Sequence, residues 1–382
     1  MGVPLRDLHD PERLSNPSGR RMVVLKLIAG LVLLIVGAES LVRGASRIAT
    51  VIGVSPLVIG LTVVAFGTSS PELGVSMMSA LDGNPGIALG NVVGSNIFNV
   101  LLILGVSALI TPLIVAQQLI RLDVPVMIGV SLLVLLFGFD GRVETWEAGL
   151  LVVCGILYTT YVIRLSRKEK DREVIKEYEE AYGEKQSRIQ STGVALILIL
   201  AGLGSLMLGA RWLVDGAVFL AHRFGVSDLV IGLTVIAVGT SLPEVATSVI
   251  ASMRGEKDIA VGNVIGSNIF NLVFILGITG MISPVGVPIP AQALSFDIPV
   301  MIAVAIACLP IFLTGRRLDR WEGGVFLFYY IAYTIYLILA QREAESLEVF
   351  SRGMIWFAVP LTLLTLGVAA SREYRNTQKQ KI

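Results

Sequence analysis

One segment of the sequence occurs twice, and this repetition constrains the fold more than any other feature. Residues 57–73 read LVIGLTVVAFGTSSPEL and residues 229–245 read LVIGLTVIAVGTSLPEV, with 13 of 17 positions identical. A second pair has the same spacing of 172 residues, because GNVVGSNIFN at 90–99 returns as GNVIGSNIFN at 262–271. Weaker similarity extends the repeat in both directions. The sequence therefore predicts two copies of one folding unit in a single chain.

Long apolar runs indicate what kind of unit this is. Hydrophobic residues make up 54% of the chain and charged residues 15%, and the mean hydropathy is +0.78. A membrane-spanning helix needs about 20 apolar residues. We therefore expect an all-α integral membrane protein. The predicted spans lie near residues 23–43, 51–81, 86–111, 122–140, 144–166, 191–217, 226–253, 259–283, 296–315, 322–340 and 353–371.

The number of spans in each copy predicts how the copies are oriented. Five predicted spans precede a charged linker, and five matching spans follow it. Two copies of an odd number of spans cross the membrane in opposite directions, as in many secondary transporters. The expected architecture is two inverted five-helix repeats that form a ten-helix core, plus one extra C-terminal helix. The expected boundaries are a polar N-terminal tail at 1–22, the first repeat at 23–166, a cytoplasmic linker at 167–190, the second repeat at 191–341, the additional transmembrane helix at 353–371 and a C-terminal tail at 372–382.

The positions of Lys and Arg predict the orientation of the chain. With the linker inside, 20 of the 30 Lys and Arg residues face the cytoplasm, which is the bias that short cytoplasmic loops carry. The N-terminus is then outside and the C-terminus inside, although five basic residues near the N-terminus oppose this orientation. The net charge of +1 gives no basic field that would attract nucleic acid. Cys154 and Cys308 lie in apolar runs without metal-ligand spacing.

A proline lies inside the first repeated segment of each copy. Pro71 and Pro243 each remove an amide donor and clash with the carbonyl group four residues earlier. We therefore expect the helices to break near residues 67–68 and 239–240. Irregular backbone at membrane depth is tolerated only where protein buries it or where it lines a cavity. The freed carbonyl groups should therefore face a polar site.

A glutamate follows each proline. Glu72 and Glu244 fall in the first turn of the next half-helix, where the helix dipole favours a carboxylate. One charge at the centre of a membrane helix costs roughly 3 kcal/mol, and a divalent cation between the two glutamates would offset that cost. Other oxygen-bearing side chains recur at steps of four in both repeated motifs of each copy, namely Thr68, Ser76, Thr240 and Ser248 in the first motif and Asn91, Ser95, Asn99, Asn263, Ser267 and Asn271 in the second, with Ser69 and Ser241 beside the first set. The alternative interpretation is that these hydroxyl and amide groups only join helices together.

Other charged residues in the spans have structural interpretations. Asp123 and Asp297 each lie two residues before a proline, and we interpret them as caps at helix starts. Two opposite-charge pairs spaced four residues apart are expected to be local ion pairs, namely Glu39 with Arg43 and Arg211 with Asp215.

The paired motifs resemble a known family. GTSSPE and GTSLPE, together with GNVVGSNIFN and GNVIGSNIFN, are similar to the alpha-repeats of the cation/calcium exchanger superfamily, in its prokaryotic sodium/calcium exchanger-like branch. This resemblance implies that Glu72 and Glu244 bind calcium together with the backbone oxygens of Thr68 and Thr240, while sodium competes at overlapping positions. It also implies a set of further ion contacts, namely the carbonyl groups of Ala65 and Ala237, the side chains of Ser69, Ser241, Ser95 and Ser267, and a central ring completed by Asn99 and Asn271.

The expected function is secondary active antiport of calcium for sodium by alternating access, with no catalytic residue and no cofactor. The expected partners are Ca²⁺ and Na⁺ as substrates and the lipid bilayer, in a prokaryotic plasma (inner) membrane. Proton-coupled relatives often carry histidines near these motifs, whereas this chain has only His9 and His222, which favours sodium.

Two alternative functions stay open. A proton/calcium antiporter, or one for another divalent cation, is possible because buried glutamates can take up protons. A passive cation channel is the more remote alternative. An intramembrane hydrolase is disfavoured, because neither motif holds a histidine or lysine that could act as a base.

Overall fold

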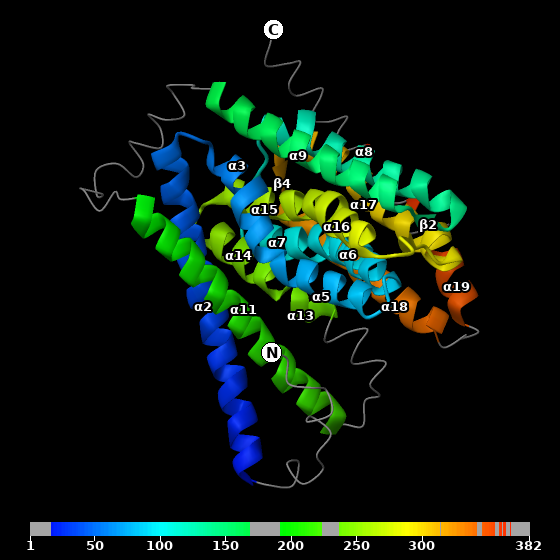
Figure 1. Cartoon of the computed structure of the whole chain (residues 1–382), viewed down its shortest axis with the longest axis horizontal. Coiled ribbons are helices and arrows are strands. Elements are labelled where there is room, and N and C mark those ends of the chain that lie inside the picture. The colour runs from blue at the N-terminus through cyan, green and yellow to red at the C-terminus, as the bar shows by residue number, and fades with distance from the viewer. Residues whose placement is uncertain are drawn as a thin grey trace.

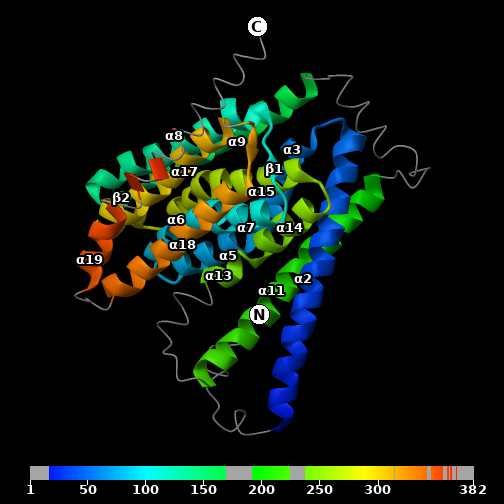
Figure 2. The ribbon, with the colours of Figure 1, turned by 180° about the vertical axis from the view of Figure 1, so that it is seen from behind.

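The structure of the chain is a computed structural model that describes residues 17–168, 192–223, 237–313, 315–341 and 346–355, together with 359, 360, 362, 363 and 367. These residues are almost entirely helical, with four strands of two residues each. Two long helices lie along one side of a bundle that the other helices form (Figure 1 and Figure 2).

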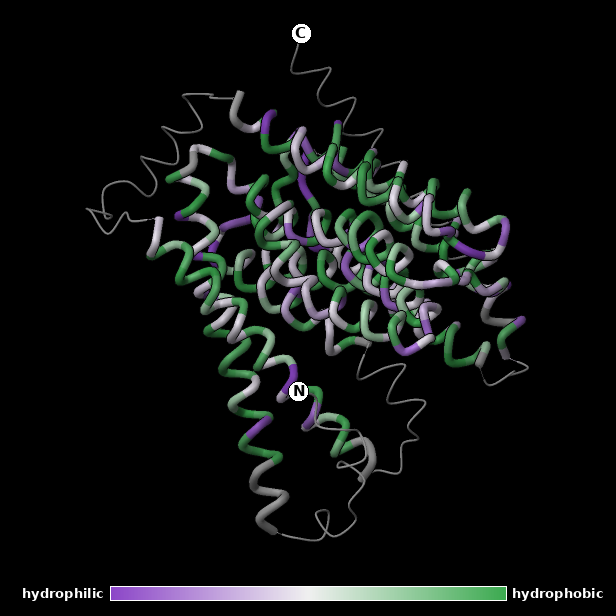
Figure 3. The backbone as a smooth tube through the Cα atoms, viewed as in Figure 1, coloured by the Kyte–Doolittle hydropathy of each residue, from purple (hydrophilic) through white to green (hydrophobic). Residues whose placement is uncertain are grey.

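The two long helices are α2 (Pro17–Ile52) and α11 (Thr192–Arg223). Apolar residues dominate along both (Figure 3). Many of these side chains point away from protein, and 65% of Leu25 and 66% of Ile197 are exposed. Large apolar side chains with this exposure are expected where a helix faces lipid rather than water. α2 begins at Pro17, inside the segment for which the sequence predicts a polar tail.

Glycines allow the two long helices to pack backbone against backbone. A Cβ atom added to Gly202 would lie 2.7 Å from the backbone nitrogen of Leu41, and one added to Gly37 would lie 2.8 Å from that of Leu206. Helices in lipid associate where small residues permit such close approach. Any larger side chain at these positions would push α2 and α11 apart.

The remaining helices of the first half begin with a broken helix and end with an outer one. Their bounds are α3 (Pro56–Ile59), η2 (Gly60–Val64), α4 (Ala65–Thr68), α5 (Ser70–Leu81), α6 (Gly86–Phe98), η3 (Asn99–Leu104), α7 (Gly105–Ile110), η4 (Leu119–Asp123), α8 (Val124–Phe137), η5 (Gly138–Asp140) and α9 (Thr145–Lys168).

The second half has the same order of helices where it is described. Their bounds are α13 (Ala237–Thr240), α14 (Leu242–Met253), α15 (Lys257–Phe270), η8 (Asn271–Ile275), α16 (Leu276–Ile282), η9 (Ala293–Asp297), α17 (Ile298–Leu313), α18 (Arg320–Gln341) and α19 (Ser346–Gly353). The π-helical segments η3 and η8 occupy equivalent places in the two halves, directly after the GSNIF sequences. Such π segments in α-helices are frequent at functional sites.

The two helices that carry the GSNIFN sequences form the centre of the bundle. Of the most apolar stretch of each helix, 94% is buried in Lys257–Ile282 and 72% in Gly86–Ile110. The corresponding values are only 22% in Thr145–Ser166 and 17% in Arg320–Ala340. The two helices that carry the GSNIFN sequences are therefore surrounded by protein, whereas α9 and α18 lie at the periphery.

Two short antiparallel strand pairs connect the halves. β1 (Leu113–Ile114) pairs with β4 (Arg317–Leu318), and β2 (Arg142–Val143) pairs with β3 (Val287–Pro288). Each pair takes one strand from each half. The halves are therefore joined by backbone hydrogen bonds as well as by helix packing.

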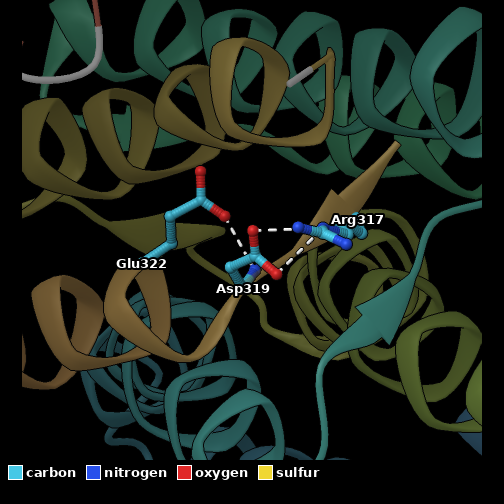
Figure 4. Close-up of polar contacts among 3 residues, drawn as sticks. All are labelled: Arg317, Asp319 and Glu322. Atoms are coloured by element: carbon cyan, nitrogen blue, oxygen red, sulfur yellow. Dashed lines mark hydrogen bonds and ion pairs between the residues drawn. The ribbon is translucent and has the colours of Figure 1, made fainter. Parts of the chain in front are cut away.

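Each of the outer helices α9 and α18 is capped by a glutamate at its third residue. The backbone N–H of Asp319 donates to Oε2 of Glu322 at 2.8 Å, and the Asp319 carboxylate pairs with Arg317 at 2.9 Å (Figure 4). In the first half the backbone N–H of Glu144 donates to Oε2 of Glu147, also at 2.8 Å. This is the glutamate half of a capping box, which satisfies an N–H group that the helix leaves unpaired. The recurrence of Glu147 and Glu322 therefore has a structural cause.

Within the described residues, eight helices are long and apolar enough to cross a membrane, and the broken helix makes up to nine spans. The chain is therefore a multi-pass, all-α integral membrane protein. These helices coincide with nine of the predicted spans, namely 23–43, 51–81, 86–111, 122–140, 144–166, 191–217, 259–283, 296–315 and 322–340. The predicted span near 226–253 lies partly outside the described residues, and so do most of the predicted helix at 353–371 and nearly all of the predicted linker.

The prediction that Asp123 caps a helix start is wrong. The segment η4 runs directly into α8, so no new N-terminus forms there, and the Asp123 side chain makes no capping hydrogen bond. Instead, the hydroxyl group of Tyr158 donates to Asp123 at 2.9 Å. Asp297 likewise lies where η9 continues into α17, and Tyr333 donates to it at 3.0 Å. Both aspartates connect their helix to an outer helix.

One of the two predicted local ion pairs forms. Glu39 pairs with Arg43 at 2.5 Å. The prediction that Arg211 pairs with Asp215 is wrong, because Asp215 pairs with Lys26 of α2 at 3.6 Å. This contact joins the two long helices.

Candidate ion-binding site

Each broken helix is interrupted at a serine. Ser69 separates α4 from α5, and Ser241 separates α13 from α14. The backbone angles are φ −82° and ψ 6° at Ser69 and φ −89° and ψ 5° at Ser241, which is the bridge region where many active-site residues sit. Pro71 and Pro243 lie in the first turn of the next helix, where proline is tolerated best. The predicted breaks therefore exist, one residue further along the chain than expected.

The two serines each contact the glutamate of the other half. Oγ of Ser69 donates to Oε1 of Glu244 at 2.9 Å, and Oγ of Ser241 donates to Oε1 of Glu72 at 2.9 Å. Both glutamates are buried, with 2% of Glu72 and 1% of Glu244 exposed. Ser69 lies three residues before Glu72, and Ser241 lies three residues before Glu244. Each hydrogen bond therefore places the glutamate of one half beside the helix break that precedes the glutamate of the other half. The structure therefore brings together two acidic side chains that are far apart in the sequence.

Some of the oxygen-bearing side chains near the glutamates join helices. Nδ2 of Asn91 donates to Oγ of Ser76 at 3.0 Å and to the backbone carbonyl of Glu72 at 3.2 Å. In the second half, Nδ2 of Asn263 donates to Oγ of Ser248 at 3.0 Å. For these side chains the alternative interpretation from the sequence holds, because their polar groups are used between helices.

The predicted backbone ligands lie at the ends of the short helices before the breaks. Oγ1 of Thr68 donates to Oδ1 of Asn263 at 3.1 Å, so the threonine hydroxyl holds two helices together while its carbonyl group is at the break. The carbonyl of Ala65 accepts a backbone N–H one turn later at 3.0 Å. Ala237 and Thr240 begin and end α13, the equivalent helix of the second half.

The second repeated motif reaches the same region. Oγ of Ser95 lies 3.3 Å from Oγ of Ser241 and so connects α6 to the glutamate pair. Ser267, its equivalent in α15, is fully buried and its Oγ has no hydrogen-bond partner. Asn99 and Asn271 lie one helical turn further along the same helix faces. Each is 1% exposed, and its Oδ1 has no hydrogen-bond partner.

Five buried oxygen atoms of the predicted site residues thus lack a hydrogen-bond partner, namely Oε2 of Glu72, Oε2 of Glu244, Oδ1 of Asn99, Oδ1 of Asn271 and Oγ of Ser267. Leaving a buried polar atom unpaired costs about 1–3 kcal/mol, and such atoms are rare. Carboxylate and amide oxygens are ligands of hard cations such as Ca²⁺. No three His, Cys, Asp or Glu side chains cluster in the described part of the chain. A cation here would therefore depend on neutral oxygens for most of its ligands.

Two residues of this region escaped the sequence analysis. Asn96 and Asn268 bond to Asn271 and Asn99 respectively. They lie three rather than four residues from the next asparagine, so they fell outside the predicted polar faces. Their recurrence at the 172-residue spacing was the available signal.

Known proteins share this sequence and fold. The chain matches the sodium/calcium exchanger protein family over residues 22–164 and 194–339. It is 36% identical over 344 residues to the sodium/calcium exchanger MaX1 of Methanosarcina acetivorans, which covers 82% of this chain and 97% of that protein. It is also 36% identical over 283 residues to the inner membrane protein YrbG of Escherichia coli, which covers 74% of this chain and 87% of that protein.

Solved structures of the sodium-calcium exchanger NCX_Mj have the same fold. One of them, soaked without Na⁺ and Ca²⁺, has a TM-score of 0.71 and 31% sequence identity, and the match covers 82% of this chain and 98% of that one. Another, soaked with Na⁺ and Sr²⁺, has a TM-score of 0.69 and 32% identity. The family match spans both copies of the repeat, including the broken helices and both glutamates. The chain therefore belongs to the sodium/calcium exchanger family of membrane ion exchangers.

Proposed function

We propose that the chain is a secondary active antiporter that exchanges calcium for sodium across the membrane by alternating access. The observation on which this proposal rests is the buried pair Glu72 and Glu244, in which each carboxylate bonds to a serine of the other half and keeps one unpartnered oxygen. Membership of the exchanger family supports transport of cations. The relatives MaX1 and NCX_Mj are named for sodium and calcium.

Charge balance gives the physical reason for exchange. Two carboxylates neutralise one Ca²⁺, so the loaded site has no large net charge to move through an apolar barrier. Sodium ions at the same carboxylates would also balance the charge. Without cations, two like charges would face each other in a region of low dielectric, where their repulsion is much stronger than in water. The empty transporter should therefore switch slowly between its inward-open and outward-open conformations. Because only the loaded protein switches readily, movement of one ion is coupled to return of the other.

The proposed ligands follow the two broken helices and the two central ones. Calcium would bind the carboxylates of Glu72 and Glu244 and the backbone oxygens of Thr68 and Thr240. Sodium would bind overlapping positions, namely the carbonyl groups of Ala65 and Ala237 and the hydroxyl groups of Ser69, Ser241, Ser95 and Ser267. The amide oxygens of Asn99 and Asn271 would complete the site, and their lack of hydrogen-bond partners supports this role.

The proposed architecture is a ten-helix core of two inverted five-helix halves, with an additional helix at 353–371. The strand pairs support it, because exchanging the two halves converts the pair of β1 with β4 into the pair of β3 with β2. We further propose a prokaryotic plasma (inner) membrane, with the N-terminus outside and the linker at 167–190 and the C-terminus inside. The long helices α2 and α11, which pack on each other at glycines, would slide past the core to change its facing.

Sodium is favoured over protons as the counter-ion by the composition of the site. Among the proposed ligands only Glu72 and Glu244 are acidic, and neither histidine of the sequence, His9 or His222, falls within a repeated motif. Protons could still exchange at the glutamates themselves. The coupling ion therefore needs a direct test.

Purified protein in liposomes separates the candidates. Vesicles loaded with Na⁺ and diluted into sodium-free buffer at equal pH should take up ⁴⁵Ca²⁺, and collapsing the sodium gradient with a sodium ionophore should stop uptake. Uptake that follows only an imposed pH gradient would instead identify a proton antiporter. Single-channel currents carried by calcium would identify a channel, and either result would overturn sodium/calcium antiport.

A further inference from the structure

The two central helices cross at a reciprocal pair of asparagines. Nδ2 of Asn96 in α6 donates to the backbone carbonyl of Asn268 in α15 at 3.1 Å, and Nδ2 of Asn268 donates to the backbone carbonyl of Asn96 at 3.2 Å. Both side chains are 2% exposed. The crossing lies three residues before the π-helical segments η3 and η8 and joins equivalent positions of the two halves.

This crossing fixes the orientation of the Asn96 and Asn268 side-chain amides. A backbone carbonyl can only accept a hydrogen bond, so the NH₂ groups of Asn96 and Asn268 must face it. Their Oδ1 atoms must then point the other way, and an amide oxygen can also only accept. Nδ2 of Asn271 donates to Oδ1 of Asn96 at 3.0 Å, and Nδ2 of Asn99 donates to Oδ1 of Asn268 at 3.0 Å.

The orientation of the Asn96 and Asn268 amides therefore fixes the orientation of the Asn271 and Asn99 amides. Because the NH₂ groups of Asn99 and Asn271 are committed to these bonds, their Oδ1 atoms are the groups left over. Both Oδ1 atoms are buried and have no hydrogen-bond partner. An amide with the opposite orientation would present NH₂ donors there, which repel a cation.

We propose that Asn96 and Asn268 are positioning residues for ion binding, which orient the amides of Asn271 and Asn99 so that carbonyl oxygens face the cation. This inference rests on the proposed function, because it assigns an ion to those oxygens. Asn96 also makes position 271 specific for an amide. A carboxylate at 271 would have no N–H to donate and would face Oδ1 of Asn96 with another acceptor.

Calcium titration of the purified full-length protein in sodium-free buffer tests this inference through double-mutant cycles. Asn96→Ala and Asn268→Ala should each weaken Ca²⁺ binding roughly tenfold, because the amide they orient becomes free to rotate. The double variant Asn96→Ala/Asn271→Ala should bind no more weakly than Asn271→Ala alone, and Asn268→Ala/Asn99→Ala no more weakly than Asn99→Ala alone.

The crossed combinations provide the control. Asn96→Ala with Asn99→Ala, and Asn268→Ala with Asn271→Ala, should show multiplied losses, since these residues share no side-chain bond. A purely structural role would weaken binding equally in all four double variants, and that pattern would overturn the inference. Asn84→Ala, which alters an exposed amide in a turn, should leave binding unchanged.

The effect of Asn96→Ala on calcium affinity should reverse when residue 271 is an aspartate. This reversal provides a second test, because a loss of folding would lower the affinity in both backgrounds. Asn271→Asp adds a negative charge but should weaken calcium binding, because it faces Oδ1 of Asn96. Adding Asn96→Ala to Asn271→Asp should strengthen binding, whereas adding it to the natural Asn271 weakens binding. If Asn96→Ala weakens calcium binding in both backgrounds, or strengthens it in both, the inference is overturned.

The outcomes also distinguish this inference from the function beneath it. Wild-type protein that does not bind calcium would overturn both proposals. Wild-type protein that binds calcium, with the same coupling in all four double variants, would overturn only the positioning role. If one Asn96 variant does not fold, the Asn268 and Asn99 pair gives an independent answer from the other half.

Discussion

Each glutamate of the proposed site is held by a serine from the other half of the chain. Ser69 and Ser241 can do this because each lies at a helix break, where the backbone leaves the α-helical region and the side chain points across the interface. The hydrogen bond takes only one oxygen of each carboxylate. The other oxygen stays available for a cation.

Removing the charge of either glutamate should abolish calcium transport. Losing one charged partner of a buried pair typically costs about 2–5 kcal/mol, so Glu72→Gln and Glu244→Gln should each lower calcium affinity by roughly 30-fold or more. Both variants should fold, because Gln can still accept the serine hydrogen bond. Calcium uptake into sodium-loaded liposomes measures the effect. Asp123→Asn, which alters a buried aspartate bonded to Tyr158, should retain uptake, and near-normal flux in both glutamine variants would contradict the site.

The serine at the first break should matter more than its neighbour. Ser69→Ala removes a hydrogen bond to a carboxylate, and such bonds contribute about 1.5–3 kcal/mol, so calcium affinity should fall roughly tenfold or more. Ser70→Ala removes only an exposed hydrogen bond from Ser70 to the carbonyl of Phe66 in the preceding helix α4, and this bond does not reach a glutamate. Calcium titration of the two variants should separate them, and equal affinities would count against the role of Ser69.

At the scale of elements, the long helices and the core use different packing. α2 and α11 meet through glycines with their backbones in contact, whereas the central helices meet through buried amides that hydrogen-bond across the interface. The ion pair of Lys26 with Asp215 also joins α2 to α11, but it is partly exposed, and exposed ion pairs contribute little. The buried amides fix the register of the central pair. The mobile part of the proposed cycle is therefore expected at α2 and α11.

The glycine contact gives a matched test on one helix. Gly202→Ala would place a Cβ atom 2.7 Å from the backbone of α2, and such overpacking costs about 1–3 kcal/mol. Gly204 has nothing within 4 Å of its Cβ position, so Gly204→Ala should be neutral or stabilise the helix by up to about 1 kcal/mol. In detergent, Gly202→Ala should lower the thermal unfolding temperature, whereas Gly204→Ala should leave it unchanged or raise it. Similar shifts would mean that the long helices do not meet at Gly202.

At the scale of the whole molecule, both halves contribute to the proposed site, and neither half contains it alone. Each half supplies one carboxylate and the serine that holds the other half's carboxylate. The strand pairs and the asparagine crossing also join one half to the other. A cation at the glutamates would therefore stabilise the association of the halves as well as its own site.

Calcium should accordingly raise the thermal stability of the purified protein. A ligand at 100 times its dissociation constant stabilises the folded state by about 2.7 kcal/mol, and removing calcium with a chelator should reverse the increase in Tm. Sodium should raise Tm by the same route and compete with calcium. The double variant Glu72→Gln/Glu244→Gln should show no shift with either ion, and an unchanged calcium shift in that variant would place the bound ion elsewhere.

The sequence by itself determined the features that depend on local periodicity and composition. Apolar length predicted the spans, the duplication predicted matching halves, and Pro71 and Pro243 predicted the helix breaks to within one residue. These features follow from chain geometry and from the solvent, because a proline interrupts a helix and lipid requires long apolar helices in any surroundings.

Only the tertiary structure decided how each polar atom is used. Ser76 and Asn99 carry equally good oxygen atoms, yet Ser76 receives a hydrogen bond from Asn91 while Oδ1 of Asn99 has no partner. The bond from Tyr158 to Asp123 and the orienting role of Asn96 likewise depend on neighbours that are distant in sequence. A hydrogen bond is specified by the positions of two groups in space, and sequence spacing predicts those positions only within a single helix.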